Sequence, residues 1–166
     1  MAFSTSLLRL LGGFSLSLGR VGGRLLSAED LHVQRLLVQA GYQVHYEPRA
    51  AVWHHVPASR LTQQWFLDRA YSEGLSGAVM RVMLEQLPHQ RRVRMAIRSL
   101  IQLLMHPKEW AGGWLRADEA SRFANRCQVR RRLGMIRGLL AHDSSSTTNG
   151  SDRRSAKTGS PNGRRL

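Results

Sequence analysis

Two neighbouring acids, Glu29 and Asp30, are the first residues of this chain whose types and spacing could do chemistry. They follow Ser27 at the predicted start of a helix, where backbone N–H groups favour an ionised carboxylate. Such a carboxylate can take the proton from a hydroxyl group that attacks an electrophile. The same spacing also fits a capping box, with Asp30 in place of the usual Glu. The pair therefore predicts either a general base with a supporting acid or a helix cap.

Histidine, arginine and aromatic side chains follow farther along the chain. His54 and His55 stand at the end of a predicted strand, and a neutral imidazole is a common metal ligand. Arg60 could bind a phosphate through its guanidinium, and Trp65 could stack on a sugar ring. The simpler alternatives are two histidines on opposite sides of a strand end, and a Trp65 that packs in the core with Phe66.

The elements that must position these groups are predicted to be mixed α/β at first and helical afterwards. Residues 43–46 and 51–54 are predicted to be two short strands, joined by a turn at 47–49. Two short strands are too few for a stable sheet, so we expect them to be the edge of a sheet whose main strands lie elsewhere. Five helices are expected: after Thr5 or Ser6 up to Leu11, after Ser27 up to Ala40, after Thr62 up to Leu87, over 89–105 and over about 116–140.

The charge of the chain implies an anionic partner. Lysine and arginine number 25 against 11 acids, which gives a formal net charge of +14. Phosphate, nucleic acid or an acidic membrane face would each suit this charge. The single cysteine, Cys127, excludes an internal disulfide and indicates a reducing compartment. No run of about 18 apolar residues predicts a transmembrane helix.

The helix expected over 89–105 is basic and amphipathic. It sets Val93, Ile97, Leu100, Ile101 and Leu104 against Arg91, Arg92, Arg94 and Arg98. Such a helix can lie at a lipid interface, with arginines at acidic head groups. The alternative is a solvated helix that packs against another part of the protein. Residues 142–166 are almost free of apolar side chains and are predicted to be disordered.

Several groups of residues over positions 1–80 carry a family resemblance because of their order. They are Gly12-Gly13-Phe14, Glu29-Asp30, Ala40-Gly41-Tyr42, Tyr46-Glu47-Pro48 with His54, and Arg60 with Trp65 and Gly74. Each group alone is commonplace. In this order and at this spacing they resemble the bacterial family 2 glycosyltransferases, which have the GT-A fold.

The resemblance implies an α/β fold class, as a partial GT-A-like (nucleotide-diphospho-sugar transferase) fold with two short strands. A mostly helical C-terminal region and a disordered tail would follow. Residues 1–80 would be the acceptor-side part of the catalytic domain. Residues 81–141 would be the basic amphipathic helical region, and 142–166 the tail.

The resemblance also assigns roles to particular residues. Asp30 matches the general base of the family, and Glu29 would orient the acceptor hydroxyl or support the loop. His54 matches a histidine that helps to bind a divalent metal, Mn²⁺ or Mg²⁺, in the complete enzyme. The glycine-rich loop over residues 19–24 would be a lid on the acceptor side. Such a loop is as often a simple connection. The substrate-binding residues would be Arg60, Trp65, Gly22 and Gly23.

The implied function is that of an inverting glycosyltransferase, which transfers a sugar from a nucleotide sugar to a hydroxyl acceptor in polysaccharide or glycolipid synthesis. The sequence contains no D-x-D motif, which the family uses to bind the donor. We therefore expect a fragment that is inactive alone and that works with a separate N-terminal half or as a homo-oligomer. The expected location is the cytoplasm, on the inner face of the plasma membrane. The alternatives are a basic nucleic-acid-binding protein and a non-catalytic peripheral membrane module.

Overall fold

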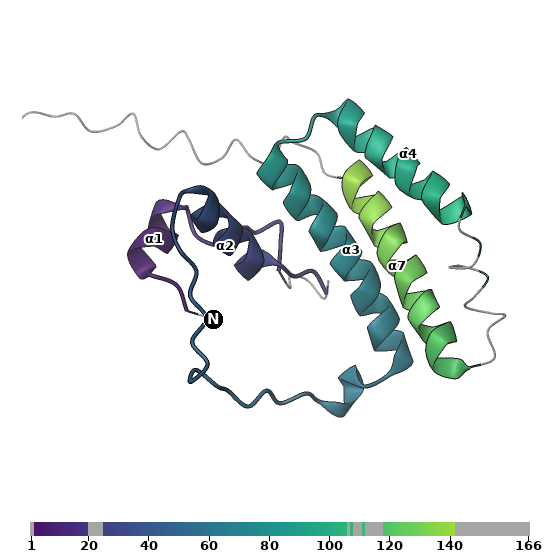
Figure 1. Ribbon diagram of the computed structural model, residues 1–166, viewed down its shortest axis with the longest axis horizontal. Coiled ribbons are helices and arrows are strands. Elements are labelled where there is room, and N and C mark those ends of the chain that lie inside the picture. Colours follow the sequence, from purple (N-terminus) through teal and green to yellow (C-terminus); the bar gives the residue numbers. More distant parts are fainter. Residues whose placement is uncertain (1, 20–24, 106, 108–110, 112–117, 142–166) are drawn as a thin grey trace, which may run out of the picture.

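The computed structural model describes residues 2–19, 25–105, 107, 111 and 118–141 (Figure 1). The described residues contain helices and connecting segments, and no β-strand. The prediction of an α/β fold with two short strands is therefore wrong. The helical elements are α1 (Thr5–Leu10), α2 (Glu29–Gln39), the short 3-10 helix η1 (Ala58–Arg60), α3 (Gln63–Glu85), α4 (His89–Met105) and α7 (Glu119–Ala141).

The two predicted strands, 43–46 and 51–54, form one extended and exposed segment between α2 and η1. Tyr46 is 90% exposed and Trp53 is fully exposed. A strand is stabilised by hydrogen bonds to a neighbouring strand, and no such neighbour exists in the part of the chain that the structure describes. The alternating side chains gave these residues the pattern of strands without a partner to pair with.

The predicted start of the long central helix is confirmed at α3. The Oγ1 atom of Thr62 accepts a hydrogen bond from the backbone N–H of Trp65 at 3.2 Å, which satisfies one of the free donors of the first turn. The helix ends at Gln86, whose φ of 46° is left-handed. Pro88 follows, and α4 begins at the next residue. The predicted helices over 89–105 and about 116–140 are likewise confirmed as α4 and α7.

The capping box predicted at Ser27 is wrong. The residue that precedes α2 is Ala28, in a left-handed conformation with a φ of 80°, and no side chain caps the helix. The backbone N–H of Ser27 donates instead to the Oγ of Ser76, at 3.0 Å. Contact with α3 therefore decides the conformation here, because Ser27 lies against that helix.

The cap predicted for α1 is also wrong, whereas the glycines that end the first two helices are confirmed. Ser4 rather than Thr5 or Ser6 precedes α1, and its side chain makes no cap hydrogen bond. Gly12 and Gly41 have φ values of +82° and +86°. Glycine adopts this left-handed conformation at little cost, which is why it commonly ends a helix.

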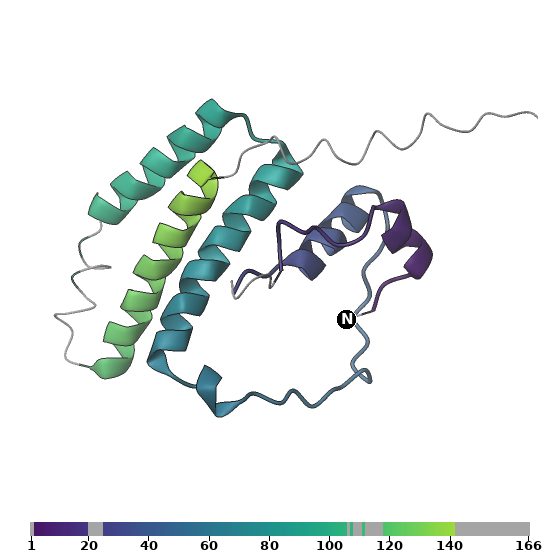
Figure 2. The same ribbon diagram turned by 180° about the vertical axis from the view of Figure 1, so that it is seen from behind.

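Helices α3, α7 and α4 lie side by side in one layer, with α7 in the middle (Figures 1 and 2). Gln63 at the start of α3 donates to Glu119 at the start of α7 at 3.3 Å. Farther along, Gly74 meets Arg131 and Ala78 meets Gly138. The two helices therefore run in the same direction, and α4 runs back along the other side of α7.

Glycines allow α3 and α7 to approach closely. A Cβ atom built on Gly74 would overlap the carbonyl oxygen of Arg131, and one on Gly134 would overlap that of Tyr71. A Cβ on Gly138 would come within 2.7 Å of the carbonyl oxygen of Leu75. Backbone therefore packs on backbone along this interface. A larger residue at any of these three glycines would overlap the backbone of the other helix.

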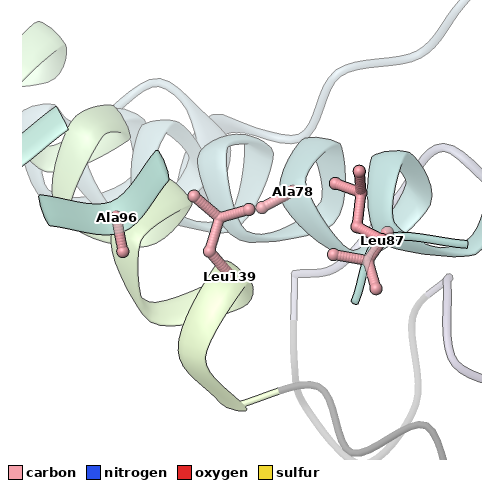
Figure 3. Close-up of a cluster of buried hydrophobic side chains, with 5 residues drawn as sticks. Ala78, Leu87, Ala96 and Leu139 are labelled. Atoms are coloured by element: carbon pink, nitrogen blue, oxygen red, sulfur yellow. The ribbon is translucent and has the colours of Figure 1, made fainter. Parts of the chain in front are cut away.

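The apolar core lies at the end of the layer where the three helices meet (Figure 3). Leu139 of α7 is 1% exposed and packs with Ala78 of α3 and Ala96 of α4. Leu87, in the turn between α3 and α4, belongs to the same cluster. Small alanines opposite a leucine let the helices close without a void.

Helices α1 and α2 lie on the outer side of α3, away from α7 (Figures 1 and 2). An Nη1 atom of Arg69 donates to the carbonyl oxygen of Leu25 at 3.3 Å. Val33 of α2 is completely buried, and His32 beside it is also buried. These contacts hold the beginning of α2, with Glu29 and Asp30, against the middle of the molecule.

Candidate functional site

The predicted general base lies where it can be reached. Asp30 is exposed in the first turn of α2, and its Oδ1 atom accepts a hydrogen bond from the N–H of Leu31 at 2.8 Å. The carboxylate is therefore accessible, as a base that acts on a bound hydroxyl must be.

Glu29 differs from its neighbour because it is half-buried and faces the preceding segment. A Cβ atom on Gly19 would lie 3.4 Å from the Cδ of Glu29, and Gly19 itself has a left-handed φ of +96°. Gly19 therefore lies directly against the Glu29 carboxyl group. The loop glycines Gly22 and Gly23 lie outside the described residues, as does the predicted tail 142–166.

His54 and His55 are exposed in the extended segment that leads to η1. This segment sweeps away from α2 to the N-terminal end of α3 in both views (Figures 1 and 2). Arg60 is the last residue of η1 and is half-buried. The structure therefore does not gather the histidines and Arg60 around Asp30.

The described residues gather no set of metal ligands around His54. No three His, Cys, Asp or Glu side chains in the described ranges lie close enough together to hold a metal ion. A divalent metal that His54 helps to bind in a complete enzyme would need its other ligands from outside the described residues.

The aromatic residues at the start of α3 form a small surface cluster. The ring centroids of Trp65 and Phe66 are 5.3 Å apart, and those of Phe66 and Phe123 of α7 are 6.3 Å apart. Both pairs pack edge to face. Trp65 is half-buried and Phe66 is exposed, so neither side chain lies in the core. The cluster joins the beginnings of α3 and α7, which is a structural role for Trp65.

A groove runs along one face of the layer, over α7 and between α3 and α4. It has a volume of about 700 Å³. Gly74, Ala78, Met135 and Leu139 are among the small and apolar residues that line it. Its arginines come from all three helices and are Arg81, Arg91, Arg98, Arg131 and Arg132.

The groove has the chemistry of a site for an anionic group with an apolar part. Arg81 is held by Glu85 at 2.8 Å, and Glu73 is the one carboxylate among the lining residues. Guanidinium groups bind phosphate and carboxylate through paired hydrogen bonds. None of Glu29, Asp30, His54, Arg60 and Trp65 lines this groove or the smaller one of about 380 Å³ on α2.

Sequence reasoning did not find this groove because its residues are spread over three helices. A signal for it is the spacing of small residues, with Gly134 four positions before Gly138 and Gly74 four before Ala78. This spacing places two small residues on one face of a helix and predicts close helix packing. Once α3 and α7 are joined in this way, the lining arginines come together.

Three titratable groups with shifted pKa values lie outside the groove. Burial lowers the pKa of His32, which packs between α2 and its neighbours. Burial also raises the pKa of the Cys127 thiol, which disfavours the reactive thiolate. At the surface, the hydrogen bonds from Arg49 hold the pKa of Glu47 below its usual value. None of the three belongs to a cluster that could carry out a reaction.

Helix α4 exposes the apolar stripe that its sequence predicts. The side that contacts α7 consists of Arg92, Ala96, Ser99 and Leu103, which are buried. The apolar stripe lies beside this contact and remains open: Ile97 is 52% exposed and Leu104 is 63% exposed. Among the helices of the described residues, none is long and apolar enough to cross a membrane.

Comparison with known proteins assigns no relative to the chain. No model of a protein family matches it, and no curated protein or solved structure matches it significantly.

Proposed function

We propose that the chain is the acceptor-side part of an inverting family 2 glycosyltransferase, in which Asp30 is the general base. The observation that supports this best is the exposed carboxylate of Asp30 in the first turn of α2. Asp30 belongs to the groups of residues over positions 1–80 whose order along the sequence resembles this family. The reaction would move a sugar from a nucleotide sugar to a hydroxyl acceptor.

In this proposal the chain prepares the acceptor. The Asp30 carboxylate takes the proton from the acceptor hydroxyl as the oxygen attacks the anomeric carbon. Glu29, which lies against Gly19, supports the loop on the acceptor side.

The groups that bind the donor would come from a second polypeptide or subunit. The chain has no D-x-D motif, and its described residues gather no metal ligands around His54. We therefore expect the chain alone to bind nucleotide sugars weakly and to transfer no sugar. With a donor-binding half that carries D-x-D, it should do both.

The test is calorimetric binding and sugar transfer with UDP-, GDP- and dTDP-sugars, for the chain alone and for the chain joined to a D-x-D-bearing half. Substituting Asp30→Asn in the joined protein should leave donor binding unchanged and reduce transfer by a factor of about 10² or more. The reduction follows because an amide cannot take the proton.

The matched control is Asp68→Asn, which alters another exposed acid at the surface, on α3. It should leave both donor binding and transfer unchanged. If the joined protein binds no nucleotide sugar, or if Asp68→Asn reduces transfer as much as Asp30→Asn, the proposal is wrong.

A further inference from the structure

The α4–α7 side of the layer has two opposite faces. On α4, the groove is lined by Ser99 and by Arg91, Met95, Arg98 and Gln102, the last four at spacings of four, three and four residues. The apolar stripe consists of Val93, Ile97, Leu100 and Leu104, which repeat the same spacings two residues later. Two residues correspond to about 200° of rotation along a helix. The apolar stripe therefore points away from the groove.

Helix α7 follows the same rule beside it. Its groove residues are Gln128, Arg131, Arg132, Met135 and Leu139. The residues two positions before Gln128, Arg132, Met135 and Leu139 are Arg126, Arg130, Leu133 and Arg137, which are all exposed. Because α4 packs against α7, the apolar stripe of α4 lies beside the arginines of α7 on the face opposite the groove. We call this surface the outer face and define it by Val93, Ile97, Leu100 and Leu104 with Arg126, Arg130, Leu133 and Arg137.

The outer face is positively charged and carries apolar side chains in the open. Helix α4 has four arginines and no acid, and α7 has six arginines and the single acid Glu119. Both views place α4 at the edge of the layer, far from α1 and α2 (Figures 1 and 2). No described helix therefore covers the stripe of Ile97, Leu100 and Leu104, whose exposed fractions range from 44% to 63%.

We propose that the outer face docks onto an anionic membrane surface, with the apolar stripe of α4 in the lipid interface and the arginines of α7 at the acidic head groups. The charge complementarity selects this partner. An apolar stripe beside arginines matches the boundary between acyl chains and anionic head groups. The groove then faces away from the membrane and stays open to solvent. This inference does not depend on the proposed transferase activity.

The experiment is co-sedimentation of the full chain with vesicles of phosphatidylcholine, with and without phosphatidylglycerol, in the absence of any nucleotide sugar. The chain should bind the anionic vesicles and bind the neutral ones much more weakly, and high salt should weaken binding to the anionic vesicles. The double substitution Ile97→Asn with Leu104→Asn should weaken that binding by about tenfold or more, because it removes apolar side chains from the interface. Both residues are exposed, so circular dichroism and the unfolding temperature should stay close to those of the parent.

Two matched controls separate the outer face from general effects. Leu16→Asn changes a residue that is 92% exposed elsewhere on the molecule, and it should not change binding. Removing two charges through Arg130→Gln with Arg137→Gln should weaken anionic-vesicle binding, whereas Arg35→Gln on α2 should have a smaller effect.

Several results would overturn the proposal. One is anionic-vesicle binding that the Ile97 and Leu104 substitutions leave unchanged; if the arginine substitutions still abolish it and single-stranded DNA competes, the face binds nucleic acid. Another is a dimer, seen by analytical ultracentrifugation, that Ile97→Asn with Leu104→Asn dissociates while vesicle binding persists. In that case the apolar stripe would be covered by a second copy of the chain.

Discussion

Asp30 and His32 lie two residues apart in α2, and their environments give them opposite roles. Asp30 is exposed and hydrogen-bonded by backbone, whereas His32 is buried against the body of the molecule. A turn of helix thus presents one ionisable group to solvent and removes the other from it. The accessible carboxylate is available for chemistry, and the buried imidazole affects stability.

The burial of His32 predicts a pH dependence of folding. Its pKa is lowered from 6.5 because burial disfavours the charged ring. As the pH falls below about 6.5, the unfolded chain therefore binds more protons than the folded chain, and the free energy of unfolding decreases. Urea unfolding at a series of pH values should show this decrease. His32→Gln should reduce the pH dependence, and His45→Gln, which alters an exposed histidine, should preserve it.

At the scale of elements, the pairing of α3 with α7 depends on glycine more than on large apolar side chains. Gly74, Gly134 and Gly138 each lie against backbone of the other helix. This contact positions the two helices so that Arg131 and Arg132 meet arginines of α4 in the groove. The groove is therefore a consequence of helix packing rather than of any local motif.

The close packing predicts opposite effects for two glycine-to-alanine substitutions. Gly134→Ala should lower the free energy of unfolding by about 1–3 kcal/mol, because the new methyl group overlaps the carbonyl oxygen of Tyr71. Gly77→Ala should raise it by about 0.5–1 kcal/mol, because no atom lies within 4 Å of the new methyl group and alanine favours a helix. Denaturant unfolding of both variants measures the difference. Equal effects would contradict the packing.

At the scale of the whole molecule, the chain divides into a well-packed layer and a long open connection. The helices α3, α7 and α4 share the core around Leu139. The connection over residues 40–56 has no buried residue, although it includes Val52, Trp53 and Tyr46 among its apolar side chains.

Limited digestion with trypsin should reveal this division. Arg49 is exposed in the connection, whereas the backbones of Arg92 and Arg131 are inside helices. A protease must bind its target as an extended chain, so cleavage after Arg49 should precede cleavage after Arg92 or Arg131. Mass spectrometry of early fragments measures the order. Earlier cleavage within α4 or α7 would show that the layer opens more easily than its packing indicates.

The sequence by itself determined the long helices and some of their ends. Thr62 and Pro88 lie at the two ends of α3, as the sequence predicted. Such ends can be predicted because a side-chain cap and a proline act locally. The arginine-rich and apolar sides of α4 could also be predicted, since they follow from helical periodicity. The position of Asp30 near the start of a helix was predicted as well, although its proposed role depends on the family resemblance.

Only the tertiary structure decided which of these features meet. The strands predicted at 43–46 and 51–54 were wrong because pairing depends on a neighbour that local pattern cannot supply. Ser27 does not cap α2, and its backbone N–H is hydrogen-bonded to Ser76, 49 residues away. The groove and the outer face are likewise set by how α4 and α7 pack. This packing buries one side of each helix against its neighbour and leaves another side exposed to solvent.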